Sequence, residues 1–192
     1  TEEWGGLLLT GPEARNVLSQ CTQEDLSNNA FSWLSCKTIK IDSADVFAMR
    51  VSYAGELGWE LHMPSWQVIS IYESLFEMGS PLGLKDFGGQ AFNSMRLEKM
   101  YRAYGAEFTE EISALEAGME RFLDLNRDFI GADNIRERMS SGIKTKLAYL
   151  IFDDQIPAEC FGNEAVFSDG ELTGIITSGA YGHRVGHSIA FA

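Results

Sequence analysis

Hydrophobic and polar positions alternate with a period of two over several short segments in the first half of the chain. The alternation is clear in residues 37–41 and 46–52, which the turn-forming residues 42–45 separate. This pattern predicts a β-hairpin. An apolar run at residues 7–9 predicts a further buried strand. Residues 51–63 combine the same alternation with two glycines, and they predict a strand, a tight turn and another strand.

Apolar residues spaced three and four apart predict four helices. They cover residues 12–21, 65–79, 91–99 and 132–140. Ser65 is the predicted N-cap of the second helix, and Gly142 is the predicted end of the fourth. Residues 115–123 fit a short helix or a strand equally well.

After Ile143 the pattern changes to short β-like runs that glycine-rich turns separate. The runs are residues 146–152, 164–167, 172–177 and 188–191. Such spacing predicts a small β-barrel or sandwich, so we expect a boundary between residues 1–142 and 143–192. Because the first part mixes antiparallel hairpins with covering helices, the predicted fold class is α+β, with a helix-covered antiparallel sheet followed by a small, truncated β-barrel.

The charge of the chain excludes some classes of partner. Its 192 residues include 28 acidic and 15 basic side chains, which give a net charge of -13. No stripe of Lys and Arg is present, so we expect no nucleic-acid partner. An acidic surface also argues against binding to anionic lipid, and no run approaches the ~20 apolar residues of a membrane span.

The spacing of cysteines and glycines predicts no disulfide framework, metal site or dinucleotide-binding motif. The three cysteines are widely separated and form no C-x-x-C pair, which is typical of reduced thiols rather than of a disulfide framework. No set of His, Cys, Asp and Glu has metal-ligand spacing, so we predict no metal site. No G-x-G-x-x-G occurs, so we expect no dinucleotide cofactor bound by a recognisable motif in this chain.

Polar chemistry is concentrated in residues 51–63. The hydroxyl of Tyr53 and the carboxylates of Glu56 and Glu60 come together around a corner built on two glycines. The corner is interpreted either as a polar pocket wall or as an ordinary hairpin with a solvated outer face, and pattern alone favours the hairpin. Arg96 and Glu98 allow a similar choice between a helix with salt-bridged ends and an anchor for a carboxylate.

Six motifs follow one another along the chain. They are residues 9–15 (LTGPEAR), 52–60 (SYAGELGWE), 94–98 (SMRLE), 115–118 (LEAG), 128–131 (DFIG) and 177–179 (TSG). In this order they resemble the aminomethyltransferase (glycine-cleavage T-protein) family over nearly the whole chain. Within that family, residues 96–99 (RLEK) and 104–107 (YGAE) are similar to the C-terminal, folate-binding part of dimethylglycine and sarcosine dehydrogenases.

The resemblance implies the ferredoxin-like-type half of the T-protein fold and a one-carbon transfer function. The implied reaction is oxidative N-demethylation of an N-methylated amine such as dimethylglycine or sarcosine, with the one-carbon unit captured by tetrahydrofolate as 5,10-methylenetetrahydrofolate. FAD is expected only in an oxidoreductase portion that precedes this chain in the parent or joins it in a complex. The implied location is the bacterial cytoplasm or the mitochondrial matrix.

Site residues can be carried over from the family's motifs. The resemblance assigns pterin binding to Tyr53 and Glu60, with Leu61 and His62 following. It assigns Arg121 to the pterin or the glutamate tail. The family's catalytic Asp falls before residue 1, so no catalytic residue is assigned, and we expect this chain to be an inactive fragment by itself. Phe92 stands where T-proteins have a folate-contacting Arg, which favours the dehydrogenase branch.

Two alternatives remain open. The first is a stand-alone T-protein relative that acts on another methylated metabolite, such as a sulfonium compound. The second is a non-catalytic folate-binding module, like family members used in iron–sulfur assembly. Those members carry a K-G-C-x-x-G-Q-E corner, whereas residues 53–56 are Tyr-Ala-Gly-Glu in this chain.

Overall fold

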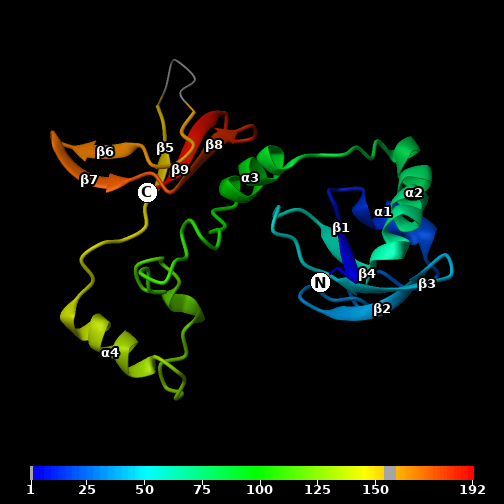
Figure 1. The fold of residues 1–192 in the computed structure, drawn as a ribbon, viewed down its shortest axis with the longest axis horizontal. Helices are drawn as coiled ribbons and strands as arrows, with labels where there is room; N and C mark the ends of the chain where they lie inside the picture. The colour runs from blue at the N-terminus through cyan, green and yellow to red at the C-terminus, as the bar shows by residue number, and fades with distance from the viewer. Residues whose placement is uncertain (1, 154–158) are drawn as a thin grey trace. The chain divides into compact units, whose positions relative to one another are not determined.

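The computed structural model describes residues 2–153 and 159–192 (Figure 1). The chain folds into two compact units, Thr1–Gly89 and Gln90–Ala192. These units are defined by packing, whereas the boundary predicted near residue 142 rests on a change of sequence pattern. That boundary stays a prediction.

The first unit is a four-stranded antiparallel sheet with both helices on the same side of it (Figure 1). The strand order is β1-β4-β3-β2, so β4 is an inner strand that pairs with β1 and β3. The strands are β1 (Trp4–Thr10), β2 (Cys36–Ile41), β3 (Ala44–Met49) and β4 (Gly58–Pro64). The helices are α1 (Ala14–Cys21) and α2 (Val68–Gly79), with short 3-10 helices η1 (Ser65–Gln67) and η2 (Ser80–Leu82) flanking α2.

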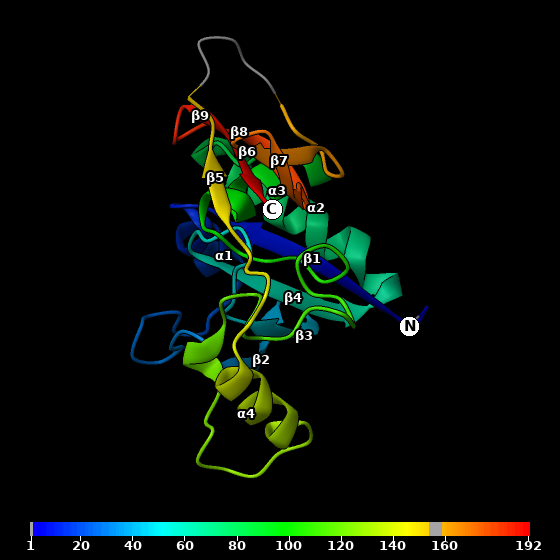
Figure 2. The same ribbon diagram turned by 90° about the vertical axis from the view of Figure 1, so that its left-hand side faces the viewer.

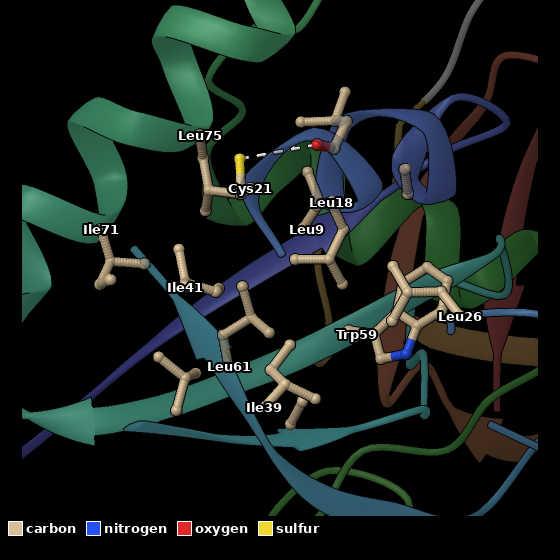
Figure 3. Packing of buried hydrophobic residues seen from close by; sticks show 14 of the residues in the cluster. Leu9, Leu18, Cys21, Leu26, Ile39, Ile41, Trp59, Leu61, Ile71 and Leu75 are labelled. Carbon is tan, nitrogen blue, oxygen red and sulfur yellow. Dashed lines mark hydrogen bonds between the residues drawn. The ribbon is translucent and has the colours of Figure 1, made fainter. Parts of the chain in front are cut away.

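One cluster of buried side chains fills the space between this sheet and its helices (Figure 3). It contains alternate residues of each strand, together with the apolar stripes of α1 and α2. The labelled members are Leu9, Leu18, Cys21, Leu26, Ile39, Ile41, Trp59, Leu61, Ile71 and Leu75. Full burial of a large apolar side chain contributes about 1.5–3 kcal/mol, so this cluster fixes which face of each strand turns inward.

Most predicted elements of the first unit form, and two of the differences concern residues 46–52 and Ser65. The strand expected over residues 46–52 ends at Met49, because the backbone N–H and C=O of Arg50 bond instead to Ser35 and Leu34. Ser65 is not an N-cap: its hydroxyl donates to the carbonyl oxygen of Glu2 at 2.7 Å, and Pro64 occupies the N-cap position of η1.

The second unit combines helices with two small sheets. Its helices are α3 (Gly89–Glu98), η3 (Glu120–Phe122) and α4 (Ala132–Ser141), and α4 ends at Gly142, as predicted. Its strands are β5 (Tyr149–Ile151), β6 (Ala165–Ser168), β7 (Glu171–Ile175), β8 (Ser178–Gly182) and β9 (His187–Phe191). They form a sheet of order β5-β9-β8 and a β6–β7 hairpin, and within this unit α4 lies away from the strands in both views (Figures 1 and 2).

Strand β8 was not predicted, because its glycines look like turn residues. A side chain at Gly179 would collide with the backbone carbonyl of Cys160, so glycine is needed here for close approach of two chain segments. Leu97, Ile189 and Phe191 form the buried centre of this unit. Within the described ranges 2–153 and 159–192, no helix has both the length and the apolar character needed to cross a bilayer.

Candidate functional site

The alternation along β4 places two polar side chains on the outer face of the first sheet. Trp59, Leu61 and Met63 are completely buried on the helix-covered side. Glu60 and His62 therefore project from the opposite side, where they are half-buried. The outer face thus carries a carboxylate and an imidazole at its centre, on a strand held by neighbours on both sides.

Glu60 and His62 contact each other on this face. The Nε2 atom of His62 lies 3.3 Å from Oε2 of Glu60, and the two side chains are 38% and 36% exposed. When Nε2 carries a proton, it donates to the carboxylate and restricts its orientation. The contact involves Oε2, one of the two oxygens of the carboxylate.

Tyr53 lies in the corner that precedes β4. Residues 53–57 form turns and bends and residues 50–52 have no regular structure, so the first strand predicted within residues 51–63 does not form. Tyr53 is half-buried. The corner is held by the backbone N–H of Gly11, which donates to the carbonyl oxygen of Leu57 at 2.8 Å. Gly58 lets the start of β4 lie close to β1, because a Cβ atom at Gly58 would come within 2.6 Å of the carbonyl oxygen of Leu9.

Leu61 and Arg121 are the two other residues assigned by the resemblance. The side chain of Leu61 is buried in the core, so the structure does not bring it together with Glu60 and His62. Arg121 is an exposed residue of η3 in the second unit, and its guanidinium lies 4.7 Å from the ring centre of Phe122. The motif match alone did not distinguish the two faces of β4, whereas the alternation of its residues did.

A buried ion pair in the second unit was not predicted. Nη1 of Arg96 lies 2.9 Å from Oε2 of Glu107, and both side chains are almost fully buried. Glu98 does not take part in this pair: its carboxylate accepts the backbone N–H groups of Arg184 and Val185.

Further hydrogen bonds complete the surroundings of Glu107. It accepts the backbone N–H of Ala103 at 2.7 Å, the hydroxyl of Thr177 at 2.8 Å and the hydroxyl of Ser178. Burial by itself raises the pKa of Glu107, but these hydrogen bonds and the charge of Arg96 outweigh burial and lower the pKa. The ionised carboxylate thus ties the loop after α3 to the start of β8.

A second feature missed from the sequence surrounds Trp59. The guanidinium carbons of Arg15 and Arg50 lie 5.9 and 5.8 Å from the centre of its ring. Both guanidiniums donate to Oδ1 of Asn28, and Arg50 also donates to the carbonyl oxygen of Phe31. Burial, and then the nearby positive charge of Arg15, lower the pKa of Arg50. These contacts fix the end of β3 next to the Tyr53 corner.

A cavity of about 260 Å³ lies elsewhere in the first unit, between the β1–α1 turn and the end of η2. Its walls are largely apolar, and none of the residues assigned to folate lines it.

Cys21, Cys36 and Cys160 are free thiols, and burial, followed by the charge of Asp42, raises the pKa of Cys21 to about 11. No group of three or more His, Cys, Asp and Glu within residues 2–153 and 159–192 is arranged to hold a metal ion.

Comparisons with known proteins match the chain from end to end. Residues 1–127 match the GCVT N-terminal domain, and residues 146–192 match the glycine cleavage T-protein C-terminal barrel domain. The crystal structure of the glycine cleavage system aminomethyltransferase T from Bartonella henselae superimposes with a TM-score of 0.81 at 23% identity, covering 98% of this chain and 50% of that one. The predicted α+β fold with a small C-terminal barrel domain is therefore confirmed.

Several curated proteins are similar over the full length of this chain. Human mitochondrial dimethylglycine dehydrogenase is 40% identical over 195 residues, which are 22% of that protein. Human mitochondrial sarcosine dehydrogenase is 31% identical over 193 residues, or 21% of its length. The aminomethyltransferase of Thermoanaerobacter pseudethanolicus is 31% identical over 194 residues, or 52% of its length.

The chain thus spans about a fifth of the dehydrogenases and half of the transferase that it matches. The N-terminal domain match covers more than half of the chain, and the barrel domain match follows it in sequence. The chain belongs to the glycine-cleavage T-protein (aminomethyltransferase) family.

Proposed function

We propose that the outer face of β4 binds the pterin of tetrahydrofolate. The observation that carries this proposal is the half-exposed Glu60–His62 pair on the outer face of an inner strand. A pterin presents N–H donors along one edge, and a carboxylate accepts two N–H groups side by side. The residues present therefore fit the group.

The proposed activity is one-carbon transfer within a larger N-demethylating enzyme that resembles the dimethylglycine and sarcosine dehydrogenases. Tetrahydrofolate, when bound, supplies the nitrogen nucleophiles that take up the one-carbon unit. Glu60 binds and orients the pterin, and His62 restrains the Glu60 carboxylate. An FAD-binding oxidoreductase portion and the N-methylated amine substrate belong to the proposed parent enzyme, which acts in the mitochondrial matrix or the bacterial cytoplasm.

Tyr53 is proposed to join Glu60 and His62 in this site, and Arg121 is proposed separately as a contact made by the second unit. The phenolic hydroxyl of Tyr53 offers a donor and an acceptor at the corner before β4. Arg121 offers a guanidinium, which pairs well with a carboxylate such as those of the glutamate tail. Leu61 is left out of the side-chain contacts because it lies in the core. No residue of this chain is assigned as the catalytic acid or base.

The dehydrogenase branch is preferred over a stand-alone transferase. The human dimethylglycine dehydrogenase shares 40% of the aligned residues, against 31% for the bacterial aminomethyltransferase. Phe92 also stands where T-proteins have an Arg that contacts folate. Both observations support a role as part of an N-demethylating enzyme.

Replacing Glu60 by glutamine is expected to weaken tetrahydrofolate binding. Loss of a hydrogen bond to a charged group costs about 1.5–3 kcal/mol, which corresponds to roughly a 10- to 100-fold rise in Kd. Isothermal titration of the whole chain with tetrahydrofolate measures this change. Glu73→Gln is the matched control, because it removes the same charge from an exposed position on α2. Equal affinities of Glu60→Gln and the unaltered chain would exclude Glu60 from the site.

A further inference from the structure

The cavity between the β1–α1 turn and the end of η2 is lined by aliphatic side chains from three elements of the first unit. Leu9 of β1, which Figure 3 labels, and Ala14 and Val17 of α1 belong to the core and are 4%, 3% and 2% exposed. The segment after α2 contributes Leu82 and Leu84, and Leu84 packs against the same core. An alkyl group of a ligand would therefore be buried against aliphatic side chains.

Two glycines leave the rim of this cavity open. Gly11 has a φ of +126° and Gly83 a φ of +81°, which is a backbone conformation that glycine adopts without strain. A Cβ atom built at either position would meet no heavy atom within 4 Å. No neighbouring side chain therefore closes the rim at these two positions.

The rim also carries one acidic and one basic side chain that are not paired with each other. Glu13 precedes α1 and Lys85 follows η2, and both line the cavity. Among the described residues, Lys85 has no ion pair or hydrogen bond through its side chain, and the carboxylate of Glu13 accepts one hydrogen bond, from Nδ2 of Asn16 to Oε2 at 2.6 Å. A ligand can therefore pair with both charges without breaking an ion pair of the protein.

Charge and size narrow the class of ligand. The net charge of -13 disfavours a purely anionic ligand, and the carboxylate of Glu13 at the rim adds to this repulsion. The volume of about 260 Å³ lies just below the range of about 300–1,000 Å³ that is typical of sites for drug-sized ligands. A small zwitterion with an aliphatic side chain matches the two charges, the apolar walls and the volume together.

We propose that this cavity binds a free aliphatic amino acid of the size of leucine. The carboxylate of the amino acid pairs with the ammonium group of Lys85, and its ammonium group pairs with the carboxylate of Glu13. Its alkyl side chain packs against Leu9, Val17 and Leu84. This site is separate from the one proposed for tetrahydrofolate, because none of the residues assigned to folate lines the cavity. The inference does not rest on the proposed function.

NMR of the whole chain, labelled with ¹³C at the leucine methyl groups, tests the site by titration with unlabelled leucine. We expect shifts at Leu9, Leu82 and Leu84, and none at Leu8, which lies opposite Glu60 in the strand register. Two analogues each lack one charge: 3-methylbutylamine has no carboxylate, and 4-methylpentanoate has no ammonium group. Each should bind about 2- to 5-fold more weakly than leucine, because a single exposed ion pair contributes little.

Two substitutions at the rim assign each charge to its partner. Lys85→Gln is expected to raise the Kd of leucine and of 4-methylpentanoate about 2- to 5-fold and to leave that of 3-methylbutylamine unchanged. Glu13→Gln should weaken leucine and 3-methylbutylamine instead. Lys144→Gln and Glu73→Gln are the matched controls, because they remove the same charges from exposed positions outside the cavity.

Three results would overturn the proposal. One is the absence of methyl shifts at Leu82 and Leu84 during titration with leucine. The second is equal binding of leucine and both analogues, which would show that the charges at the rim do not recognise the ligand. The third is an unchanged Kd of leucine in both rim variants, with circular dichroism confirming that each variant is folded.

Discussion

Glu107→Ala is expected to lower the free energy of unfolding of the second unit by about 3–5 kcal/mol. The reason is that Arg96, with a side chain only 4% exposed, would be left buried without its carboxylate partner. The hydroxyls of Thr177 and Ser178 would lose their acceptor as well. Urea unfolding followed by circular dichroism measures the change.

The same carboxylate predicts how stability depends on pH. Because the pKa of Glu107 is lowered in the folded state, its contribution is fully present above the unfolded-state pKa, about 4.3. The contribution is lost as pH falls below that value and through the lowered folded-state pKa. The stability difference between the unaltered chain and Glu107→Ala should therefore shrink in acid. Glu110→Ala, at an exposed position three residues away, is the control, and an equal effect of the two substitutions would contradict the buried-pair account.

Trp59→Ala is expected to destabilise the first unit by a similar amount, about 3–5 kcal/mol. Its indole is fully buried and packs edge-on to Phe31 with ring centres 6.1 Å apart. The guanidiniums of Arg15 and Arg50 would lose an aromatic face in addition. Unfolding is again measured by circular dichroism in urea, because the substitution alters the fluorescence signal.

Trp66→Ala is the control for this prediction. Trp66 belongs to η1 and is 80% exposed, so its removal should change stability by no more than about 0.5 kcal/mol. Comparable losses for Trp59→Ala and Trp66→Ala would show that the indole of Trp59 does not have the packing role described. If Trp59→Ala unfolds with the same free energy as the unaltered chain, the contact between Arg50 and Trp59 does not hold the Tyr53 corner in place.

Local patterns in the sequence were sufficient to predict most helices and strands of the first unit and which of their faces are buried. The alternation from Trp59 to Met63 predicts a strand with two chemically different faces, and burial of the apolar set leaves Glu60 and His62 outside. The helices α1 and α2 follow from apolar stripes that the core confirms. These features depend on neighbours within a few residues, so a period in the sequence is enough to reveal them.

The features that were missed depend on contacts between distant residues. Glu107 and Ser178 are 71 positions apart, and no local period joins them. In the sequence Gly179 has the character of a turn residue, whereas in the structure it is a strand residue against which the carbonyl of Cys160 packs. Leu61 was assigned with its neighbours because a motif records order along the chain and not the face of a strand. Packing, rather than propensity, decides each of these cases.

The central claim is that a reduced folate binds the outer face of β4. NMR of the chain labelled with ¹³C at the methyl groups of Met and Leu tests it most directly, during titration with tetrahydrofolate. Leu8 of β1 and Met49 of β3 lie directly opposite Glu60 in the strand register, one on each side of it. The account predicts shifts at their methyl groups, and none at Met78, which packs against the core on the helix-covered side. Shifts confined to Leu82 and Leu84, which line the separate cavity, or no shift at Leu8 and Met49, would contradict it.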